Sequence, residues 1–504
     1  MNHWIVAPVV LPAVVAPLMA LAMRFDIVLA RVFSMASAVA LLGIALLLLG
    51  QAADGGVQAY ALGNWPAPFG IVLVLDRLSA LMLVLTAALA LGVLLYAING
   101  RDRRGAHFHA LFQFQLMGLN GAFLTGDFFN LFVFFEVLLI ASYGLMLHGG
   151  GAARVKAGVQ YVAVNLVGST LFLFAVGLIY AVTGTLNMAD LALKVPLVAP
   201  GDRALLQTGA LLLLMVFGVK AALVPLHFWL PATYANATGP VAALFAVMTK
   251  VGAYAIIRFY PLAFGDLAGE SAWLAAPWLM PAALLTLVLG TAGIVAARSL
   301  GQMVCFAVIA SMGTLLTAVA LFSPQALSAG LYYLVHSTLA AAALFLVADL
   351  VRELRQGDDD FVMAPRFAQI GLVGGLFFAA AIAMTGMPPL SGFLGKLLIL
   401  DSARDAPNAT WIWGVILVTS LMAIIGFARG GSMLFWKTTA TRAGRRAAPA
   451  LALPVVAVGL MLAGTVGLTA FAGPVSRYMD ATAQQVFHPG AYIDAVLGAE
   501  GGNE

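Results

Sequence analysis

The stretch Phe217-Gly-Val-Lys-Ala-Ala-Leu-Val-Pro-Leu-His-Phe-Trp-Leu-Pro231 decides the fold, because its composition predicts a membrane helix that is broken in the middle. The apolar run that contains this stretch starts near Leu205, and Lys220 follows that start by about 15 residues, which at about 1.5 Å per residue puts it near the centre of a bilayer. A lysine at that depth costs about 2.5 to 3.5 kcal/mol and usually faces a wet cavity or a partner charge. Pro225 interrupts the helical hydrogen bonds, and His227 can line the break. A charge beside a helix break is typical of ion sites in transporters.

The composition of the whole chain agrees with a membrane location. The chain has 504 residues, of which 63% are hydrophobic and 9% are charged. No soluble fold can bury that much apolar surface, so we predict an all-α polytopic membrane protein in contact with the lipid bilayer. The first apolar run, from Trp4 to Met23, lacks a basic leader and is long enough to span, so we expect a first helix rather than a signal peptide. The single cysteine, Cys305, excludes a disulfide framework and is expected to be a core residue.

Apolar segments of spanning length recur along the chain, and we count 14 of them. They cover roughly residues 4–23, 29–50, 74–97, 106–126, 128–148, 156–183, 205–232, 239–264, 272–296, 301–322, 325–351, 367–402, 409–428 and 450–473. The turn-rich stretch 57–72 predicts an extramembrane hairpin, and the chain after Ser476 predicts an interfacial or soluble tail with a disordered end.

Basic residues are distributed unequally between the two sets of loops. Loops after even-numbered segments, together with both termini, hold only Arg77, Lys194, Arg203, Arg404 and Arg477. Loops after odd-numbered segments hold 16 basic residues, namely Arg24, Arg31, Arg101, Arg103, Arg104, Arg154, Lys156, Arg298, Arg352, Arg355, Arg366, Arg429, Lys437, Arg442, Arg445 and Arg446. The positive-inside rule then predicts that both termini face outward. Since the basic residues serve topology, the net charge of +4 does not indicate a nucleic-acid partner.

Few charged residues fall inside the predicted spans. The basic ones are Lys220, Lys250, Lys396 and Arg258, and the last lies near a helix end where it can snorkel to the interface. Glu136 is the acid at the centre of a span, and we expect it to pair with one of the lysines because a lone buried carboxylate is costly. Asp127 begins the same predicted helix and is expected to cap it or to lie at the interface.

Two interpretations of these interior charges are open. In the structural one, Glu136 and Lys220 form a permanent ion pair that fixes helix packing, and the other lysines bond to carbonyl groups. In the functional one, burial makes ammonium groups easier to deprotonate, so that they pass protons along a relay with water and polar side chains. His336 and His227 supply intermediate stations because an imidazole titrates near neutral pH, although a membrane histidine is often a packing residue. No metal-ligand spacing or phosphate-binding loop is present, so we expect no metal, no cofactor and no nucleotide chemistry.

A second break is predicted in Met384-Thr-Gly-Met-Pro-Pro-Leu-Ser-Gly-Phe-Leu-Gly-Lys-Leu-Leu-Ile-Leu400. Pro388 and Pro389 cannot lie inside a continuous helix, and Lys396 follows them by about two turns. The segments that contain Lys220 and Lys396 are therefore alike in plan. Paired interrupted segments indicate an inverted repeat with one site in each half.

Several fragments together carry a resemblance to a known family. They are Phe135-Glu-Val-Leu-Leu139, Lys220-Ala-Ala-Leu-Val-Pro-Leu-His-Phe-Trp-Leu-Pro231, Tyr234-Ala-Asn-Ala-Thr-Gly-Pro-Val-Ala242, Met248-Thr-Lys-Val-Gly-Ala-Tyr254, His336 with Leu344-Phe-Leu346, and Gly386-Met-Pro-Pro-Leu-Ser-Gly-Phe-Leu-Gly-Lys396. Over nearly its whole length the chain resembles the antiporter-like membrane subunits of Mrp-type multisubunit monovalent cation/proton antiporters and of respiratory complex I. Among these it is most similar to the D-type subunits of the Mrp antiporters.

The resemblance implies a fold of 14 helices with broken helices 7 and 12. Residues 1–105 would hold helices 1 to 3 and the hairpin, 106–264 and 272–436 two inverted five-helix repeats, and 450–504 helix 14 with the tail. It also implies that Glu136, Lys220, Lys250, His336 and Lys396 translocate protons, with His227, Pro225, Pro388 and Pro389 in support.

The resemblance further implies a membrane, partner subunits and transported ions. It would be a secondary-transporter subunit rather than an enzyme, in a bacterial inner membrane with partner subunits of the A, B, C, E, F and G types. Protons and Na+ or K+ would be the transported ions. The chain departs from the family pattern at Ala340 to Ala343, where members often carry a lysine, so the central link would depend on His336 and water.

Two further hypotheses stay open at this point. One is a proton-pumping subunit of a complex I type assembly, which differs in its partners. The other is a stand-alone channel or a structural scaffold, for which Glu136 and Lys220 would be dispensable for ion exchange.

Overall fold

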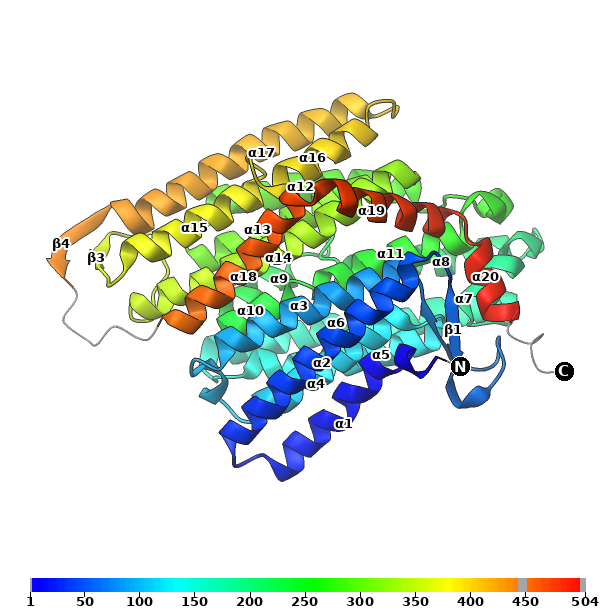
Figure 1. Cartoon of the computed structure of the whole chain (residues 1–504). Coiled ribbons are helices and arrows are strands. Elements are labelled where there is room, and N and C mark those ends of the chain that lie inside the picture. Colours follow the sequence, from blue (N-terminus) through cyan, green and yellow to red (C-terminus); the bar gives the residue numbers. More distant parts are fainter. Residues whose placement is uncertain (1, 443–450, 499–504) are drawn as a thin grey trace.

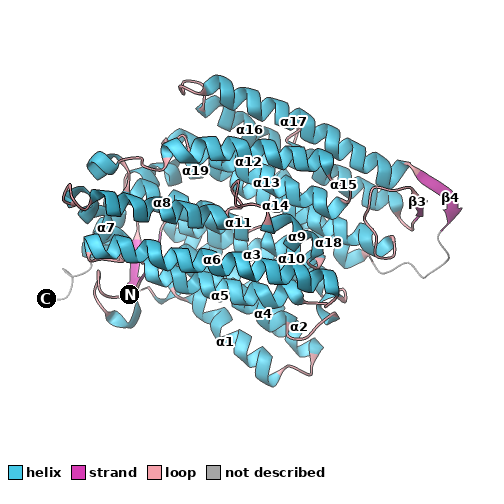
Figure 2. Ribbon diagram, turned by 180° about the vertical axis from the view of Figure 1, so that it is seen from behind, coloured by secondary structure: helices cyan, strands magenta, loops and turns pink. Residues whose placement is uncertain are grey.

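Apolar helices fill most of the computed structural model, which describes residues 2–442 and 451–498 (Figures 1 and 2). In the described part of the chain, 11 helices are long and apolar enough to cross a membrane, and α1 (Ala7–Ala22) and α15 (Ile370–Thr385) are shorter apolar helices. Each of the 14 predicted segments contains a helix. The prediction of a multi-span, all-helical membrane protein is therefore confirmed.

The first part of the chain forms three helices and a hairpin. A turn of 3-10 helix, η1, precedes α1, and two antiparallel strands join α2 to α3, as predicted for the stretch 57–72. The start of the chain at η1 packs on β2, and the last helix, α20, packs on β1, so both ends of the described chain lie at the same end of the bundle (Figure 1). The elements are η1 (His3–Ile5), α2 (Ile27–Ala53), β1 (Gln58–Ala61), η2 (Leu62–Asn64), β2 (Val72–Leu75), α3 (Arg77–Ala97) and η3 (Arg101–Arg103).

The second part contains the first broken helix. Asp127 caps α5 by accepting a hydrogen bond from the Asn130 amide at 2.8 Å, as predicted for an end cap. The predicted span 205–232 divides into α8, which ends at Lys220, and α9. The helices are α4 (Phe108–Leu124), α5 (Phe128–Leu147), α6 (Ala152–Thr183), α7 (Met188–Lys194), α8 (Arg203–Lys220), α9 (Trp229–Asn236), α10 (Gly239–Phe245) and α11 (Met248–Ala263).

The third part contains the second broken helix, formed by α15 and α16. A short parallel pair of strands, β3 and β4, lies at the end of the bundle opposite to α20 (Figure 1). The elements are α12 (Ala276–Ala296), α13 (Leu300–Val319), α14 (Pro324–Leu354), β3 (Ala364–Arg366), α16 (Ser391–Ser402), α17 (Ala409–Gly431) with a π-helical turn at Ser432–Trp436, and β4 (Thr438–Arg442).

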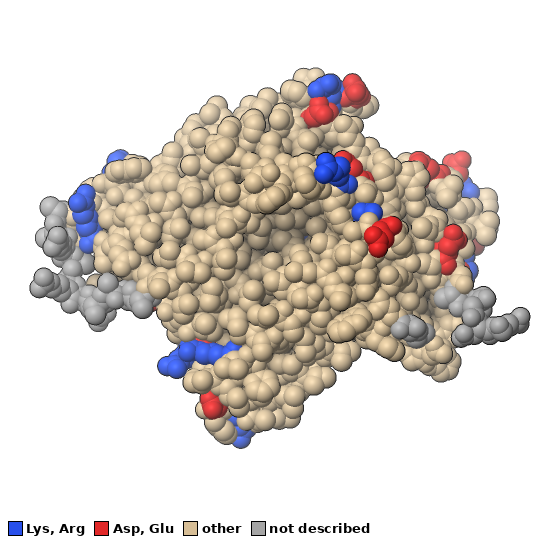
Figure 3. Space-filling view, in the orientation of Figure 1, with Lys and Arg blue, Asp and Glu red and all other residues tan. Residues whose placement is uncertain are grey.

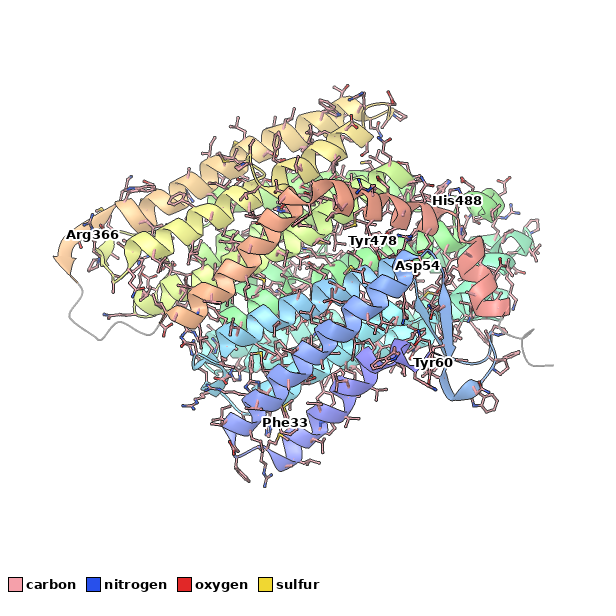
Figure 4. All side chains as sticks on the ribbon, in the orientation of Figure 1. Phe33, Asp54, Tyr60, Arg366, Tyr478 and His488 are labelled. Atoms are coloured by element: carbon pink, nitrogen blue, oxygen red, sulfur yellow. The ribbon has the colours of Figure 1, made fainter. Side chains whose placement is uncertain are left out.

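The tail predicted after Ser476 is helical in its described part. Helix α18 (Ala452–Ala470) leads directly into α19 (Ala472–Phe487), which packs on α14, α11 and α3, and α20 (Gly490–Leu497) follows. Tyr478 of α19 lies against the start of α3, where its hydroxyl donates to the Arg77 carbonyl at 2.9 Å (Figure 4). The predicted disordered end, residues 499–504, lies outside the described residues.

Exposed side chains follow the environment that a bilayer imposes. On the face shown in Figure 3, charged side chains gather toward the two ends of the bundle and leave a band without them between. Large apolar side chains on outer helices are exposed at mid-span, among them Ile140 of α5 at 64% and Val418 of α17 at 62%. Lipid tails accept such side chains at no cost, whereas a free charge at that level is expensive.

Arg258 corrects one prediction made from the sequence. It was expected to snorkel to the interface, but it is 7% exposed and forms an ion pair with Asp76, the N-cap of α3, with an Nη2 to Oδ1 distance of 2.8 Å. Tyr254 also faces the guanidinium group. The arginine therefore ties α11 to the start of α3 because a buried partner charge satisfies it better than a long reach to water.

A second ionic cluster lies in the loop before α4. Asp102 accepts two hydrogen bonds from Arg31, at 2.6 and 2.7 Å, and faces His109 Nε2 at 3.1 Å. Burial raises the pKa of the Asp102 carboxyl, but the bonds from Arg31 and His109 outweigh it and lower the pKa to about 2. Asp102 thus stays ionised and joins α2 to α4.

Candidate functional site

The first helix break leaves backbone groups that neighbouring side chains satisfy. Helix α8 ends at Lys220, and the chain is not α-helical again until α9 begins at Trp229. Trp229 Nε1 donates to the carbonyl of Val219 at 3.1 Å, and Thr286 Oγ1 of α12 accepts from the amide of Val224 at 2.9 Å. These bonds allow non-helical backbone inside the bundle, where lipid offers no partner.

Lys220 stands at the edge of this break and is buried. Its ammonium group donates to Asn165 Oδ1 of α6 at 3.0 Å and lies 5.7 Å from the centre of the Phe135 ring. Glu136, the next residue on α5, accepts a hydrogen bond from the hydroxyl of Ser169. Asn165 and Ser169 are four residues apart on α6, so they lie on the same face of that helix.

The expected direct contact between Glu136 and a lysine is not formed. No ion pair joins Glu136 to another residue of the described chain, although its charge lies within electrostatic reach of Lys220. Helix α6 packs against both α5 and α8, and its two polar side chains occupy the positions that the partner charges would otherwise take. The pair predicted from the sequence is thus replaced by two separate hydrogen bonds to α6.

Lys250 is the most deeply buried of the lysines. It lies in the first turn of α11, just after the bend between α10 and α11, and its side chain has no exposed surface. Its Nζ atom has no hydrogen-bond partner among residues 2–442 and 451–498. Gly252, one half-turn on, lets α11 approach the first break, because a Cβ atom there would lie 2.6 Å from the carbonyl oxygen of Phe217.

The second break holds Lys396 in a similar way. Helix α15 ends at Thr385, and α16 begins at Ser391. The Lys396 ammonium group donates to the carbonyl of Thr385 at 2.8 Å and to the hydroxyl of Ser420 on α17 at 2.9 Å. The lysine thus satisfies a carbonyl group that the break leaves without a helical partner. A cation at the C-terminal end of a helix is also favoured by the helix dipole.

His336 of α14 lies between the second break and Lys250. It is 1% exposed, and its Nδ1 atom lies 2.8 Å from the hydroxyl of Ser391. The charges of Lys396 and Lys250 both lie within electrostatic reach of the imidazole. The approach is close because residue 392 is glycine, where a Cβ atom would lie 2.7 Å from His336 Nε2.

A small cavity of about 20 Å³ opens beside Lys396, among helices α12 to α17. That volume matches about one water molecule, and a buried water needs two to four polar partners. The cavity offers them, since its lining includes Lys396 and the hydroxyl side chains of Thr291, Ser311, Thr314, Tyr333 and Thr419.

The supporting residues predicted from the sequence lie at the breaks but do not join the buried groups. Pro225, Pro388 and Pro389 are exposed on the surface of the chain, where they interrupt the helices without lining the interior. His227 is half-buried, and its Nδ1 atom has no hydrogen-bond partner in the described chain.

Sequence reasoning missed the neutral polar residues that hold the charged ones, namely Asn165, Ser169, Thr385, Ser391 and Ser420. One signal was available for two of them. Asn165 and Ser169 recur at a spacing of four in an otherwise apolar stretch, which indicates a polar stripe on one helix face. In the sequence, Thr385, Ser391 and Ser420 resemble ordinary hydroxyl residues of helix ends or surfaces. Their contacts with Lys396 and His336 form only in the folded structure.

The chemistry of these groups is acid–base chemistry. A carboxylate, three amines and an imidazole can each bind and release a proton, and amide, hydroxyl and carbonyl groups hold them without adding charge. The described residues contain no group of three or more His, Cys, Asp or Glu side chains placed to bind a metal ion.

Comparison with known proteins places the chain in a family. Residues 125–424 match the family described as NADH:quinone oxidoreductase/Mrp antiporter, transmembrane. The D-type subunit of a probable K+/H+ antiporter of Rhizobium meliloti is 42% identical over 99% of this chain and 98% of its own length. The D-type subunit of a Na+/H+ antiporter of Bacillus subtilis is 37% identical over 99% of this chain and 100% of its own length.

A solved structure is similar over the same range. A chain of the Mrp complex from Dietzia sp. DQ12-45-1b superposes with a TM-score of 0.87 at 29% identity, covering 99% of this chain and 100% of that one. The resemblance inferred from the sequence motifs is therefore confirmed. The chain belongs to the NADH:quinone oxidoreductase/Mrp antiporter transmembrane family.

Proposed function

We propose that this chain is a D-type, proton-translocating subunit of a multisubunit antiporter that exchanges Na+ or K+ for protons. The proton motive force drives the exchange, and the chain carries out no covalent chemistry. Its full-length similarity to the D-type subunits of two antiporters supports this proposal. The proposal covers both cations because the relatives include a subunit of a probable K+/H+ antiporter at 42% identity and one of a Na+/H+ antiporter at 37%.

The observation that carries the proposal is the row of buried and half-buried titratable groups at and between the two helix breaks. Glu136 and Lys220 lie at the first break, Lys396 at the second, and Lys250 with His336 between them. A buried amine without a hydrogen-bond partner in the described part of the chain, as at Lys250, is costly for a purely structural residue. It suits a group that meets water and exchanges a proton with it.

A dependence on partner subunits follows from the exposure of Glu136. Glu136 is only half-buried at mid-span, and a charged side chain in contact with lipid is strongly unfavourable. We infer that a neighbouring subunit covers this face of α5 and α6. Further subunits of the A, B, C, E, F and G types would complete the cation path and the assembly.

The proposal includes an orientation and a domain plan. Both ends of the chain would face the periplasm of a bacterial inner membrane, opposite to the loops with 16 basic residues. Residues 106–264 and 272–436 would be inverted repeats, each with one broken helix, flanked by 1–105 and 450–504. The two lysine-bearing breaks support this plan because each one joins a half-helix end to a buried amine.

The test uses the whole complex with all its subunits, produced in cells that lack their own antiporters. Inside-out vesicles are energised, and the recovery of acridine orange fluorescence on adding NaCl or KCl measures cation/proton exchange. Glu136→Ala and Lys220→Ala are each expected to abolish the recovery. Lys194→Ala is the matched control, because Lys194 is a partly exposed lysine paired with Asp190 on a short helix outside the breaks.

Co-purification of the other subunits shows whether each variant complex assembles. Exchange that survives both substitutions in an assembled complex would rule out the proton path proposed here. Loss of assembly in both variants would favour a scaffold role.

A second candidate is a proton-pumping subunit of a quinone-reducing complex, which the description of the family also covers. Deletion of the gene separates the two. Loss of salt or alkali tolerance supports the antiporter, whereas loss of quinone-coupled proton pumping supports the second candidate.

A further inference from the structure

We propose that Asn165 and Ser169 of α6 are positioning residues that hold Lys220 and Glu136 apart, so that Lys220 stays free to release its proton. This inference rests on the proposed function, and it goes beyond the titratable groups themselves. It assigns a role in proton transfer to two neutral side chains of one helix face.

Asn165 and Ser169 each hold one of the two charged groups. Asn165 lies 3.0 Å from the Lys220 ammonium group, and Ser169 bonds to the Glu136 carboxylate. Both polar side chains are nearly fully buried, at 1% and 7% exposed. Because they come from one helix with a spacing of four residues, they form a rigid pair whose two ends each hold one charged group.

The hydrogen bonds of Asn165 fix the orientation of its amide group. The Asn165 Nδ2 atom donates to the carbonyl of Tyr161 at 2.9 Å, one turn earlier on α6. A backbone carbonyl only accepts, so the Nδ2 atom faces Tyr161 and the Oδ1 atom is left to accept a hydrogen bond from Lys220. Tyr161 is itself held, because its hydroxyl lies 2.9 Å from that of Ser142 on α5 and its ring stacks on Trp229 at 5.4 Å.

An amide suits this position for a chemical reason. An amide oxygen accepts a hydrogen bond from a charged or a neutral amine, and it does not titrate. A carboxylate at the same distance would hold the lysine in its charged form. Glu136 is the charged group within electrostatic reach of Lys220, and Ser169 keeps its carboxylate engaged elsewhere.

An aromatic cluster closes the same face of α6 on one side. Phe172, one turn beyond Ser169, has its ring centre 5.7 Å from that of Phe135 and 6.0 Å from that of Phe217. These rings pack α6 against α5 and α8 without adding polar groups. The two hydrogen bonds are therefore the local polar contacts that decide whether the two charges meet.

The first test is the pH profile of exchange in vesicles with the whole complex. Asn165→Asp adds a carboxylate beside Lys220, so the lysine should keep its proton to higher pH, and the optimum should move up by about 1 to 3 pH units. Asn165→Leu removes the holding bond and should reduce exchange about ten- to a hundredfold, because Lys220 then turns to Glu136. Asn165→Gln, which keeps the amide, should restore a measurable part of the activity. A merely structural role would lower activity at every pH without moving the optimum.

The second test reads the Glu136 carboxyl group directly, without exchange. Subtracting the infrared spectrum of the Glu136→Gln complex from that of the wild-type complex isolates the bands of the Glu136 carboxyl group. Ser169→Ala should shift these bands, and Asn165→Leu should replace them with those of an ion-paired carboxylate. Thr170→Ala is the matched control, because the Thr170 hydroxyl bonds only to the Leu166 carbonyl of its own helix at 3.0 Å and is exposed.

The outcomes separate the two proposals. Unchanged bands and an unchanged pH optimum in Asn165→Leu and Ser169→Ala would overturn the inference even if the wild-type complex exchanges cations. If the bands shift in Asn165→Leu and Ser169→Ala but the wild-type complex exchanges no cation, the positioning role is supported and the proposed function is overturned. If Asn165→Leu does not assemble, Ser169→Ala decides the matter, because it removes one hydroxyl and leaves packing intact.

Discussion

Replacing Lys250 by methionine should make the protein more stable while it stops exchange. The lysine has no exposed surface, and its Nζ atom has no partner among the described residues. Burying a polar group without a hydrogen bond costs about 1 to 3 kcal/mol in mutational data. Methionine has a similar length and flexibility, so it should fill the same space with little strain. We therefore expect Lys250→Met to gain about 1 to 3 kcal/mol.

The measurement is the thermal unfolding midpoint of the purified complex, followed by loss of the intact peak in size-exclusion chromatography, together with vesicle exchange. The matched control is Lys220→Met. Its amine donates to Asn165, so the substitution leaves a buried acceptor unpaired and should bring no gain in stability.

The reasoning is refuted if Lys250→Met destabilises the complex as much as Lys220→Met does, because Lys250 would then have a stabilising partner. Exchange that persists in Lys250→Met would remove this lysine from the proton path. A stabilised but inactive variant is the expected result, since functional sites commonly sacrifice stability.

Three other perturbations test the packing and the charges around the site. Gly392→Ala should abolish exchange, because its Cβ atom would lie 2.3 Å from a backbone oxygen of α15, whereas Gly414→Ala, which meets open space, should leave exchange unchanged. Asp76→Asn should lower the free energy of unfolding by about 3 to 5 kcal/mol and reduce the thermal midpoint, because it leaves Arg258 buried without its partner charge. Asp102 has a folded-state pKa of about 2, below its ordinary 3.8, so its contribution to stability is present above pH 3.8 and is lost as the pH falls through about 2. Asp102→Asn should accordingly lower the thermal midpoint at neutral pH, and its difference from wild type should shrink in acid.

The local sequence pattern was sufficient to predict the helices and both helix breaks. Long apolar runs have one stable backbone solution in lipid, so each predicted segment contains a helix. Pro225 and the pair Pro388 and Pro389 located the interruptions within a few residues, because proline lacks the amide hydrogen that a helix needs. Proline alone does not mark a break, since Pro12, Pro17, Pro261 and Pro281 lie inside helices. The charged groups stood out for the same reason, because charge is rare and costly inside a membrane.

The sequence pattern did not predict the hydrogen-bond and ion-pair partners of the interior charges. Arg258 was predicted to snorkel, yet Asp76 lies beside it, because the start of α3 and the end of α11 meet only in the folded bundle. Glu136 was predicted to contact a lysine, yet Ser169 holds it. Such neighbours come from chain segments far apart in sequence, and no local period encodes which of them meet.

The amino-acid order alone therefore established a polytopic helical membrane protein with interrupted helices and a handful of interior charges, since the hydrophobic effect and backbone hydrogen bonding act locally along each span. The tertiary structure decided the packing of α6 between α5 and α8 and the contact of His336 with the second break. It also decided that Lys250 has no hydrogen-bond partner among the described residues. The reason is that a hydrogen bond forms only within about 3 Å, and helix packing alone determines which polar groups come that close.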